Sequence, residues 1–328
     1  MKKIFTTLLS IMLIAMLVAG CATPAPAPTS VPAPTVVVPT AAPTKAPEPT
    51  KAPEPTKVPE PTKVPFDIKN VLLPYHTNLP AGFYGIAPAD ALKAMQAEPK
   101  PVIVDVREAS EITPDSGWIA GAINIPIRVL AQNLDKLPKD KPLLLYCGSG
   151  LRSAIAVDVL GALDYTNMKS ITGGIAAWKT ANLPVTKEGT TPALPTTMGT
   201  KPTVNADTLA ALDKYLTSLP AGFYGVPSAD VLKELQGDKK PFLLDVREPK
   251  ELTDNGKLEG AVNVPIKELI SELDKLPKDK AAPIVVYCAV GHRGAMAMTS
   301  LRLLGHTNVR SLSGGFNAWV AAKLPTVK

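Results

Sequence analysis

The sequence predicts an α/β protein with two similar domains, each a central parallel sheet flanked by helices on both faces. The first observation behind this prediction is an internal repeat, because motifs of the first half return in order about 140 residues later. The second observation is that apolar runs alternate with segments of helical periodicity inside each copy. The repeated motifs are "LPAGFYG" (79–85 and 219–225), "DVRE" (105–108 and 245–248), "GAINIP" and "GAVNVP" (121–126 and 260–265), and "GGIAAW" and "GGFNAW" (173–178 and 314–319).

The strands expected in the first copy are uninterrupted apolar runs, at 101–106 and 142–147. Such runs suit parallel strands that are covered on both faces. Helical spacing is found between them, at 128–137, and again after the second run, where an apolar residue recurs every four positions from 151 to 159. Strand and helix alternation implies crossover connections and a parallel sheet, in which ligands bind beyond the carboxyl ends of the strands.

The repeat also sets the expected domain boundaries. The first domain is predicted at 66–185 and the second at 205–328. Residues 186–204 are rich in Thr, Pro and Gly and are predicted to be the linker between them.

The N-terminus has the layout of a secretory signal, with two lysines, an apolar core and small residues before Cys21. "VAGC" at 18–21 resembles the lipobox of bacterial lipoproteins. The resemblance implies a signal peptide at 1–20, cleavage before Cys21 and lipid attachment to its sulfur. An uncleaved membrane anchor is the alternative, and the apolar stretch is at the short limit for one. Either interpretation places the chain outside the cytoplasm, at the cell membrane.

Residues 21–65 are predicted to be a lipid-anchored spacer. They consist almost entirely of Pro, Ala, Thr, Val, Lys and Glu, and the chain as a whole has 35 prolines in 328 residues. Too few large apolar residues are present for a core. Proline favours an extended course, so the reach of the spacer is on the order of 100 Å.

Composition argues against several classes of partner. The formal net charge is only +6, and no basic stretch is interleaved with aromatic residues, so nucleic acid is not an expected partner. The three histidines form no ligand cluster and no paired C-x-x-C spacing occurs, so neither a metal nor a cofactor is expected.

The chemistry is expected in two similar loops, "YCGSGLRS" at 146–153 and "YCAVGHRG" at 287–294, which hold two of the three cysteines. Each follows a strand and precedes a helix, so its backbone N–H groups can form an anion-binding nest at the positive end of that helix. A thiol at such a place is expected to ionise readily and to act as a nucleophile. The predicted nucleophiles are Cys147 and Cys288, and the predicted substrate-binding residues are Gly148, Ser149, Gly150, Leu151, Arg152, Ala289, Val290, Gly291, His292 and Arg293.

Two structural alternatives exist for these cysteines. A cysteine that ends a buried strand can be a small apolar core residue. A disulfide between Cys147 and Cys288 would require equivalent strand ends of two separate domains to approach within about 7 Å between Cα atoms. The presence of C-x-x-G-x-R in both copies, in a chain that otherwise avoids cysteine, favours function.

Other repeated residues are interpreted as structural. Asp105 with Arg107, and Asp245 with Arg247, are expected to form buried ion pairs that support the loops. The aromatic residues of "LPAGFYG", Phe83 in the first copy among them, can line a cleft, but repeated packing is the favoured interpretation.

Both copies resemble rhodanese domains, the sulfurtransferase family. "DVRE", "GAINIP", "CGSGLRS" and "GGIAAW" occur in family order in the first copy, and "DVRE", "GAVNVP", "CAVGHRG" and "GGFNAW" in the second. The resemblance implies a parallel α/β fold and a cycle in which the cysteine takes sulfane sulfur from a donor such as thiosulfate. The cysteine then holds the sulfur as a persulfide and passes it to a thiophilic acceptor, cyanide or a thiol. Small sulfur-containing anions and thiols are therefore the expected partners, besides the membrane at Cys21.

Loops of this kind are compatible with two other functions. Cysteine phosphatases use a similar cradle, but their loops are one residue longer, C-x5-R, to hold tetrahedral phosphate. Four residues separate cysteine and arginine in both loops here, which favours sulfur. The alternative from another class is a non-catalytic persulfide carrier or a module that binds an anion or a partner.

Overall fold

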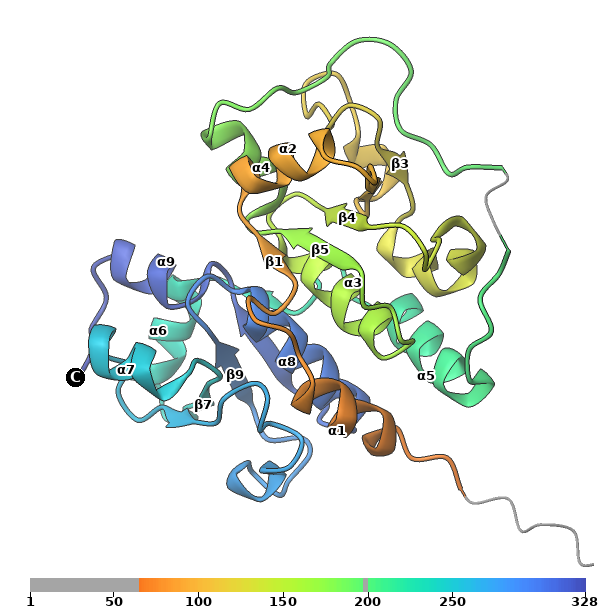
Figure 1. The fold of residues 1–328 in the computed structure, drawn as a ribbon. Helices are drawn as coiled ribbons and strands as arrows, with labels where there is room; N and C mark the ends of the chain where they lie inside the picture. Colours follow the sequence, from red (N-terminus) through yellow and green to blue (C-terminus); the bar gives the residue numbers. More distant parts are fainter. Residues whose placement is uncertain (1–64, 197–199) are drawn as a thin grey trace, which may run out of the picture. The chain divides into compact units, whose positions relative to one another are not determined.

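The computed structural model describes residues 65–196 and 200–328, which fold into two five-stranded sheets, one in each repeat (Figure 1). The described residues belong to one compact unit. The predicted signal peptide at 1–20, the lipidation site at Cys21 and all but the last residue of the predicted spacer lie outside the described residues.

Both sheets are parallel and have equivalent strand orders, β1-β5-β4-β2-β3 in the first repeat and β6-β10-β9-β7-β8 in the second. The strands of the first repeat are β1 (Gly85–Ile86), β2 (Val102–Asp105), β3 (Ile123–Asn124), β4 (Leu143–Tyr146) and β5 (Met168–Ile171). Those of the second are β6 (Gly225–Val226), β7 (Phe242–Asp245), β8 (Val262–Asn263), β9 (Ile284–Tyr287) and β10 (Val309–Leu312).

Helical segments connect these strands. In the first repeat they are α1 (Lys69–Thr77), α2 (Pro88–Gln96), η1 (Ala109–Glu111), η2 (Ile127–Lys136), α3 (Leu151–Gly161) and α4 (Gly174–Thr180). In the second they are α5 (Ala206–Thr217), α6 (Ser228–Gln236), α7 (Pro249–Asn255), η3 (Leu273–Lys275), α8 (His292–Leu303) and α9 (Gly315–Ala321).

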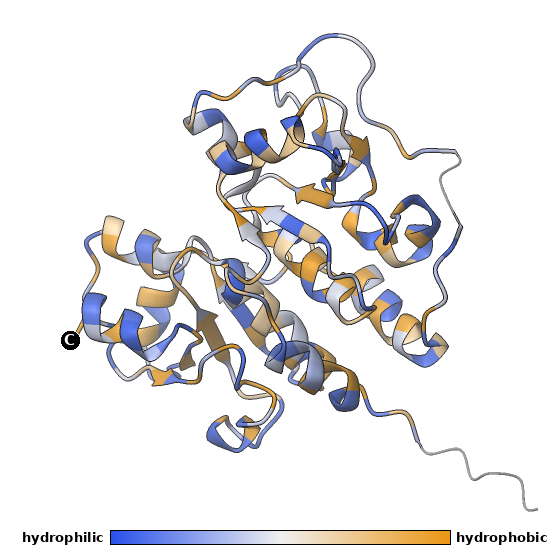
Figure 2. Ribbon diagram, in the orientation of Figure 1, coloured by the Kyte–Doolittle hydropathy of each residue, from blue (hydrophilic) through white to orange (hydrophobic). Residues whose placement is uncertain are grey.

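Each sheet has helices on both faces, which confirms the predicted fold class. Successive side chains of a strand point to opposite faces. In β4, Leu144 and Tyr146 accordingly join one core with side chains of α2 and α4, whereas Leu143 and Leu145 join another with α3. The middle strand of each sheet, β4 or β9, is mostly apolar, as expected for a strand with both faces covered (Figure 2).

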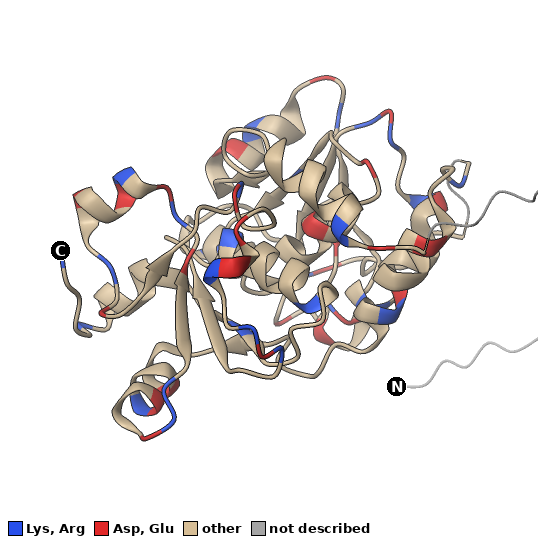
Figure 3. Ribbon diagram, turned by 90° about the horizontal axis from the view of Figure 1, so that it is seen from below, with Lys and Arg blue, Asp and Glu red and all other residues tan. Residues whose placement is uncertain are grey.

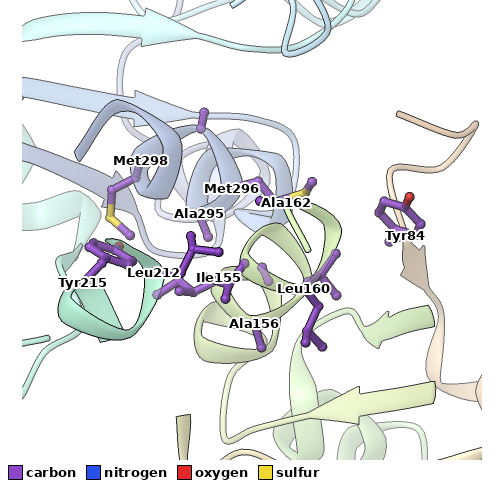
Figure 4. Close-up of a cluster of buried hydrophobic side chains, with 14 of the residues drawn as sticks. Tyr84, Ile155, Ala156, Leu160, Ala162, Leu212, Tyr215, Ala295, Met296 and Met298 are labelled. Atoms are coloured by element: carbon purple, nitrogen blue, oxygen red, sulfur yellow. The ribbon is translucent and has the colours of Figure 1, made fainter. Parts of the chain in front are cut away.

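The two repeats share one apolar core. Helix α3 is buried from Arg152 to Gly161, and α8 is buried from His292 to Leu301. Figure 4 shows the reason, because side chains of α3, α8 and α5 meet in a single cluster. The internal repeat predicts two separate domains. In the structure, however, the helix that follows each cysteine loop (the loop helix, α3 or α8) has its outer face covered by the other repeat.

The first helix of each repeat packs on the other repeat. His76 at the end of α1 is fully buried, with its Nδ1 2.9 Å from the carbonyl oxygen of Ile266 and its Nε2 2.8 Å from the hydroxyl of Ser300. Conversely, α5 packs against η2, where the Gln132 amide donates to the Asp213 carboxylate at 3.1 Å. The N-terminal helix of each repeat therefore contacts the opposite repeat.

The segment predicted to be helical at 128–137 is a 3₁₀ segment, η2, with a kink at Asn133, whose φ is −118°. The Asn133 side chain donates to the carbonyl oxygen of Val129 at 2.8 Å. An asparagine side chain that bonds to the backbone in this way competes with regular helical hydrogen bonds.

The charged side chains of the described residues are mixed in sign along the ribbon (Figure 3). None of the helices in the described ranges combines the length and apolarity needed to cross a membrane.

Candidate active site

The two loop cysteines lie where the sequence places them, at the carboxyl ends of central strands. Cys147 directly follows β4 and Cys288 directly follows β9, and each loop leads into a long helix, α3 or α8. Both cysteines are fully buried, and neither is in a disulfide. The positive ends of two helices are thus directed at the two loops.

Glycines shape each loop and the turn beneath it. Gly150 and Gly291 have left-handed φ values of 90° and 91°, which favour glycine. The N–H of Gly150 donates to Cys147 Sγ at 3.1 Å. The Gly-Gly turn of the last motif packs against the loop so closely that a Cβ at Gly174 would lie 2.4 Å from the carbonyl oxygen of Cys147. A Cβ at Gly315 would likewise lie 2.3 Å from the carbonyl oxygen of Cys288, which explains the second glycine of the Gly-Gly turn in both repeats.

Arg152 is the second residue of α3 and is anchored by a glutamate. Its two terminal nitrogens donate to the two oxygens of Glu111, Nη2 at 2.7 Å from Oε1. Burial alone would lower the pKa of Arg152, but Glu111 and the Cys147 sulfur outweigh it, so the pKa lies above its usual value. The guanidinium is therefore permanently charged beside the cysteine.

The second repeat has the same arrangement. Arg293 Nη1 and Nη2 donate to the Glu251 oxygens at 2.6 and 2.7 Å. Burial raises the pKa of Glu251, but Arg293 outweighs this effect and the pKa lies below its usual value.

Sequence reasoning missed both glutamates. Each follows "DVRE" by three residues, and its carboxylate also accepts the backbone N–H of Glu108 or Glu248 in a capping box. The repeated E-x-x-E spacing at 108–111 and 248–251 is the signal that identifies them.

The "DVRE" aspartates and arginines form the buried ion pairs expected from the sequence. Arg107 Nη2 donates to Asp105 at 2.6 Å and to the carbonyl oxygen of Gly117 at 2.9 Å. In the second repeat Arg247 makes the same bonds to Asp245 and Gly256, at 2.6 and 2.8 Å. A supporting role for the loops stays a prediction.

The two sites differ at the third residue of the loop helix. In the first repeat the Ser153 hydroxyl lies 3.8 Å from Cys147 Sγ and accepts a hydrogen bond from Ser170 at 2.8 Å. Gly294 occupies the equivalent position in the second repeat, and the buried hydroxyl of Ser311 has no partner among the described residues. The first site therefore has a hydroxyl that the second lacks.

They also differ at the first residue of that helix, Leu151 or His292. The His292 ring donates from Nε2 to the carbonyl oxygen of Phe83 at 2.8 Å. Its buried Nδ1 has no partner among the described residues. Burial lowers the pKa of His292 to about 4, so the imidazole is neutral near pH 7.

A pocket of about 420 Å³ opens beside Cys288. Its lining includes Phe83, which also packs against the apolar core, so this residue has both of the roles that the motif allows. The next residue, Tyr84, is buried in the core as expected. The lining residues are Gly82, Phe83, Gly85, Ile86, Ala87, Pro88, Thr172, Glu251, Cys288, Val290, His292 and Arg293.

A second, smaller cavity of about 60 Å³ is lined by both loops at once, through residues 149–151 and 290–292. The structure thus brings the predicted residues of the two loops close together. Within residues 65–196 and 200–328, no group of three or more His, Cys, Asp or Glu side chains is arranged to hold a metal ion.

The sequence matches the rhodanese-like domain family twice, at residues 88–181 and 228–322, which together make up more than half of the chain. A sulfurtransferase of Allochromatium vinosum is 33% identical over 84 residues, which cover 26% of this chain and 77% of that protein. The human thiosulfate:glutathione sulfurtransferase is 30% identical over 110 residues, covering 29% of this chain and 95% of that protein.

Among solved structures, a rhodanese-related protein from Thermoplasma volcanium is 36% identical, with a TM-score of 0.29, and the match covers 32% of this chain and 98% of that one. Both family matches contain a complete loop with its cysteine and arginine. The chain therefore belongs to the rhodanese-like family, with two rhodanese-like domains in tandem, and is a sulfurtransferase at the level of that family.

Proposed function

We propose that the chain moves sulfane sulfur from a small anionic donor such as thiosulfate, through persulfides on Cys147 and Cys288, to a thiophilic acceptor. The observation that carries the proposal is the cradle at Cys147, where a loop N–H points at the sulfur 3.1 Å away and the α3 N-terminus follows. Such a cradle stabilises the negative charge of a thiolate and of the persulfide formed from it.

The cycle consists of two displacements at sulfur. The cysteine thiolate attacks the outer sulfur of thiosulfate, the S–S bond of thiosulfate breaks, and sulfite leaves with the bonding electrons. The acceptor, cyanide or a thiolate, then attacks the outer sulfur of the persulfide and releases the cysteine thiolate. No external oxidant or reductant is needed, because the transferred sulfur has the same oxidation state in thiosulfate, in the persulfide and in the product. A covalent intermediate divides one difficult step into two.

Arg152 and Arg293 are predicted to hold the anionic substrate. Each is already paired with a glutamate in the structure, which balances most of its charge. In the proposed cycle, the loop N–H groups and the helix N-terminus are accordingly the principal partners of the anion, and the arginine is a fixed neighbouring charge.

The relatives guide the choice of substrates to test. The name of the human protein specifies thiosulfate as donor and glutathione as acceptor. We propose the same classes for this chain, a thiosulfate-like anion and a thiol, with cyanide as the standard artificial acceptor.

Persulfide formation on cysteine variants tests this proposal. The intact chain and the Cys147→Ser, Cys288→Ser and double variants are treated with thiosulfate, and the mass gain of one sulfur per site is measured. We expect two sulfurs on the intact chain, one on each single variant and none on the double variant. Sulfur loading that persists in the double variant would overturn the assignment. Loading without turnover in the presence of an acceptor would instead indicate a persulfide carrier.

We also propose that Cys21 carries a lipid that anchors the chain at the outside of the cell membrane. The support is the "VAGC" sequence after a basic and apolar leader. Metabolic labelling with a radioactive fatty acid tests it, and we expect a label on the intact chain that Cys21→Ser abolishes. Labelling of the variant would contradict the assignment.

A further inference from the structure

The repeated "LPAGFYG" segment crosses from each repeat to the cysteine loop of the other. The Phe83 ring of the first repeat lies 4.9 Å from the guanidinium carbon of Arg293 in the second. The Phe223 ring of the second repeat lies 4.8 Å from the guanidinium carbon of Arg152 in the first. A guanidinium at this distance over an aromatic face makes a cation–π contact. The two contacts are equivalent under the internal repeat.

The backbone of both segments is strained in the same way. Phe83 and Tyr84 have φ values of 53° and 60°, and Phe223 and Tyr224 have values of 50° and 58°. Bulky residues rarely adopt this left-handed region, at a cost of about 1–3 kcal/mol each, and such strain is concentrated at functional sites. Two successive aromatic residues in this conformation, in both repeats, indicate that the direction of the phenylalanine ring is important.

Further crossed contacts fix the two segments. In the second site the carbonyl oxygen of Phe83 accepts the hydrogen bond from His292 at 2.8 Å. In the first site Leu151 packs against Gly225, so tightly that a Cβ there would lie 2.9 Å from Leu151 Cδ2. In both sites, the segment of the opposite repeat therefore contacts the arginine and also the first residue of the loop helix.

Each arginine is consequently held by both repeats. Its nitrogens are bound by a glutamate of its own repeat, and one face of its guanidinium is covered by a phenylalanine of the other. At the second site that phenylalanine is also a wall of the pocket beside Cys288. Removal of the ring would leave the arginine with one anchor and would open the pocket.

From these contacts we propose that the two repeats complete each other's sulfur-transfer sites, with Phe83 as a positioning residue for Cys288 and Phe223 as a positioning residue for Cys147. The proposal rests on the proposed function and adds the rule that each site is built in part by the opposite repeat. The pair of repeats is then the smallest active unit, although each contains its own cysteine loop.

The test uses full chains that retain one cysteine loop each. Phe83→Ala and Phe223→Ala are introduced separately into the Cys147→Ser and Cys288→Ser chains, and thiosulfate:cyanide turnover is measured. In the Cys147→Ser chain, we expect Phe83→Ala to lower kcat/KM about fivefold and Phe223→Ala to change it less than about twofold, since a cation–π contact amounts to about 1 kcal/mol. In the Cys288→Ser chain we expect the reverse. An effect on the site of the same repeat, or no effect, would overturn the proposal.

Two controls separate positioning from loss of structure. Phe83→Tyr keeps the aromatic face and is expected to retain the activity of the Cys288 site, whereas Phe83→Leu keeps only apolar bulk and is not. A general loss of folding would lower Tm in both single-site chains and reduce the turnover of both. That result would contradict the proposal.

Alkylation keeps the test independent of sulfur transfer. The reaction of the remaining loop cysteine with iodoacetamide is followed by mass spectrometry in the same chains. We expect Phe83→Ala to change the rate at Cys288 about fivefold and to leave the rate at Cys147 unaltered, because a lost cation–π contact of about 1 kcal/mol corresponds to a change of this size. Chains that show this crossed pattern without thiosulfate turnover would refute the proposed function and support the crossed sites. Equal rates in all variants would refute the crossed sites.

Discussion

Glu111 binds Arg152 through both carboxylate oxygens, with Arg152 Nη2 2.7 Å from Oε1. The carboxylate also accepts the N–H of Glu108 at 2.8 Å, so it is itself fixed by the backbone. Glu111 therefore determines where the permanent charge beside Cys147 is located.

Loss of this carboxylate is expected to impair the first site. In the Cys288→Ser chain, Glu111→Ala frees the guanidinium and should lower kcat/KM for thiosulfate about tenfold, the scale of a lost charge-assisted hydrogen bond. Steady-state thiocyanate formation measures it. Glu251→Ala in the same chain is the control and should have little effect, because it supports the other arginine. An unchanged or faster rate in Glu111→Ala would show that the arginine does not need this anchor.

The hydroxyl of Ser153 is expected to make the two sites unequal. It lies 3.8 Å from Cys147 Sγ, and Gly294 offers no such group to Cys288. Ser153→Ala should slow persulfide formation on Cys147 about threefold to tenfold, because a weak hydrogen bond to sulfur is worth about 1 kcal/mol.

Rapid-quench mass spectrometry with thiosulfate measures the rate at each cysteine of the intact chain. Cys288 is the internal control, since its rate should not change. Equal slowing at both cysteines would point to a general structural effect in place of the local contact.

Much of the fold was predictable from sequence, because apolar runs and the internal repeat are local signals. The run at 142–147 predicted β4 and the position of Cys147 at its carboxyl end, and both are confirmed. The 3₁₀ geometry of η2 was not predictable, because helical spacing does not distinguish it from an α-helix.

Contacts between the repeats were harder to predict from the sequence. Phe83 carries the same sequence motif whether its ring packs in its own repeat or over Arg293 of the other. Helix α3 gave one hint, because Ala154 and Gly161 are small residues on the face opposite its apolar stripe, which would otherwise be a solvent face. Small residues allow close helix packing, but only the fold shows that the neighbour is α8.

The stability of the chain is expected to depend on His292 in acid. Its pKa is lowered to about 4 in the fold, chiefly by burial and also by Arg293, whereas an unfolded histidine titrates near 6.5. As pH falls from about 6.5 to 4, the unfolded chain gains this proton and the folded chain does not, so the free energy of unfolding decreases. The loss amounts to about 3 kcal/mol and levels off below the folded pKa.

Urea unfolding between pH 7 and pH 4 measures this effect. His292→Leu, which copies Leu151 of the first repeat, removes the titrating group and should show a shallower decrease. His76, whose pKa burial also lowers to about 4, contributes equally to both proteins and cancels in the comparison. Parallel pH profiles for the two proteins would contradict the prediction.

The shared core predicts that the two repeats unfold together. Met296 of α8 is fully buried in the cluster formed with α3 and α5. Met296→Ala should destabilise the chain by about 2–5 kcal/mol, because it removes buried methylene groups and leaves a cavity. Calorimetry should show one cooperative transition at a lower Tm.

Hydrogen exchange identifies which parts of the chain share that transition. Protection of the central strands β4 and β9 should decrease by the same factor in Met296→Ala, although the substitution lies in the second repeat. Val231→Ala is the matched control. Val231 of α6 lies in a core formed by residues of the second repeat alone, so this substitution affects no contact between the repeats. Two transitions, with only that of the second repeat shifted by Met296→Ala, would show that each repeat is stable alone. One transition in both variants is expected, because α3 and α8 each have a face that only the other repeat covers.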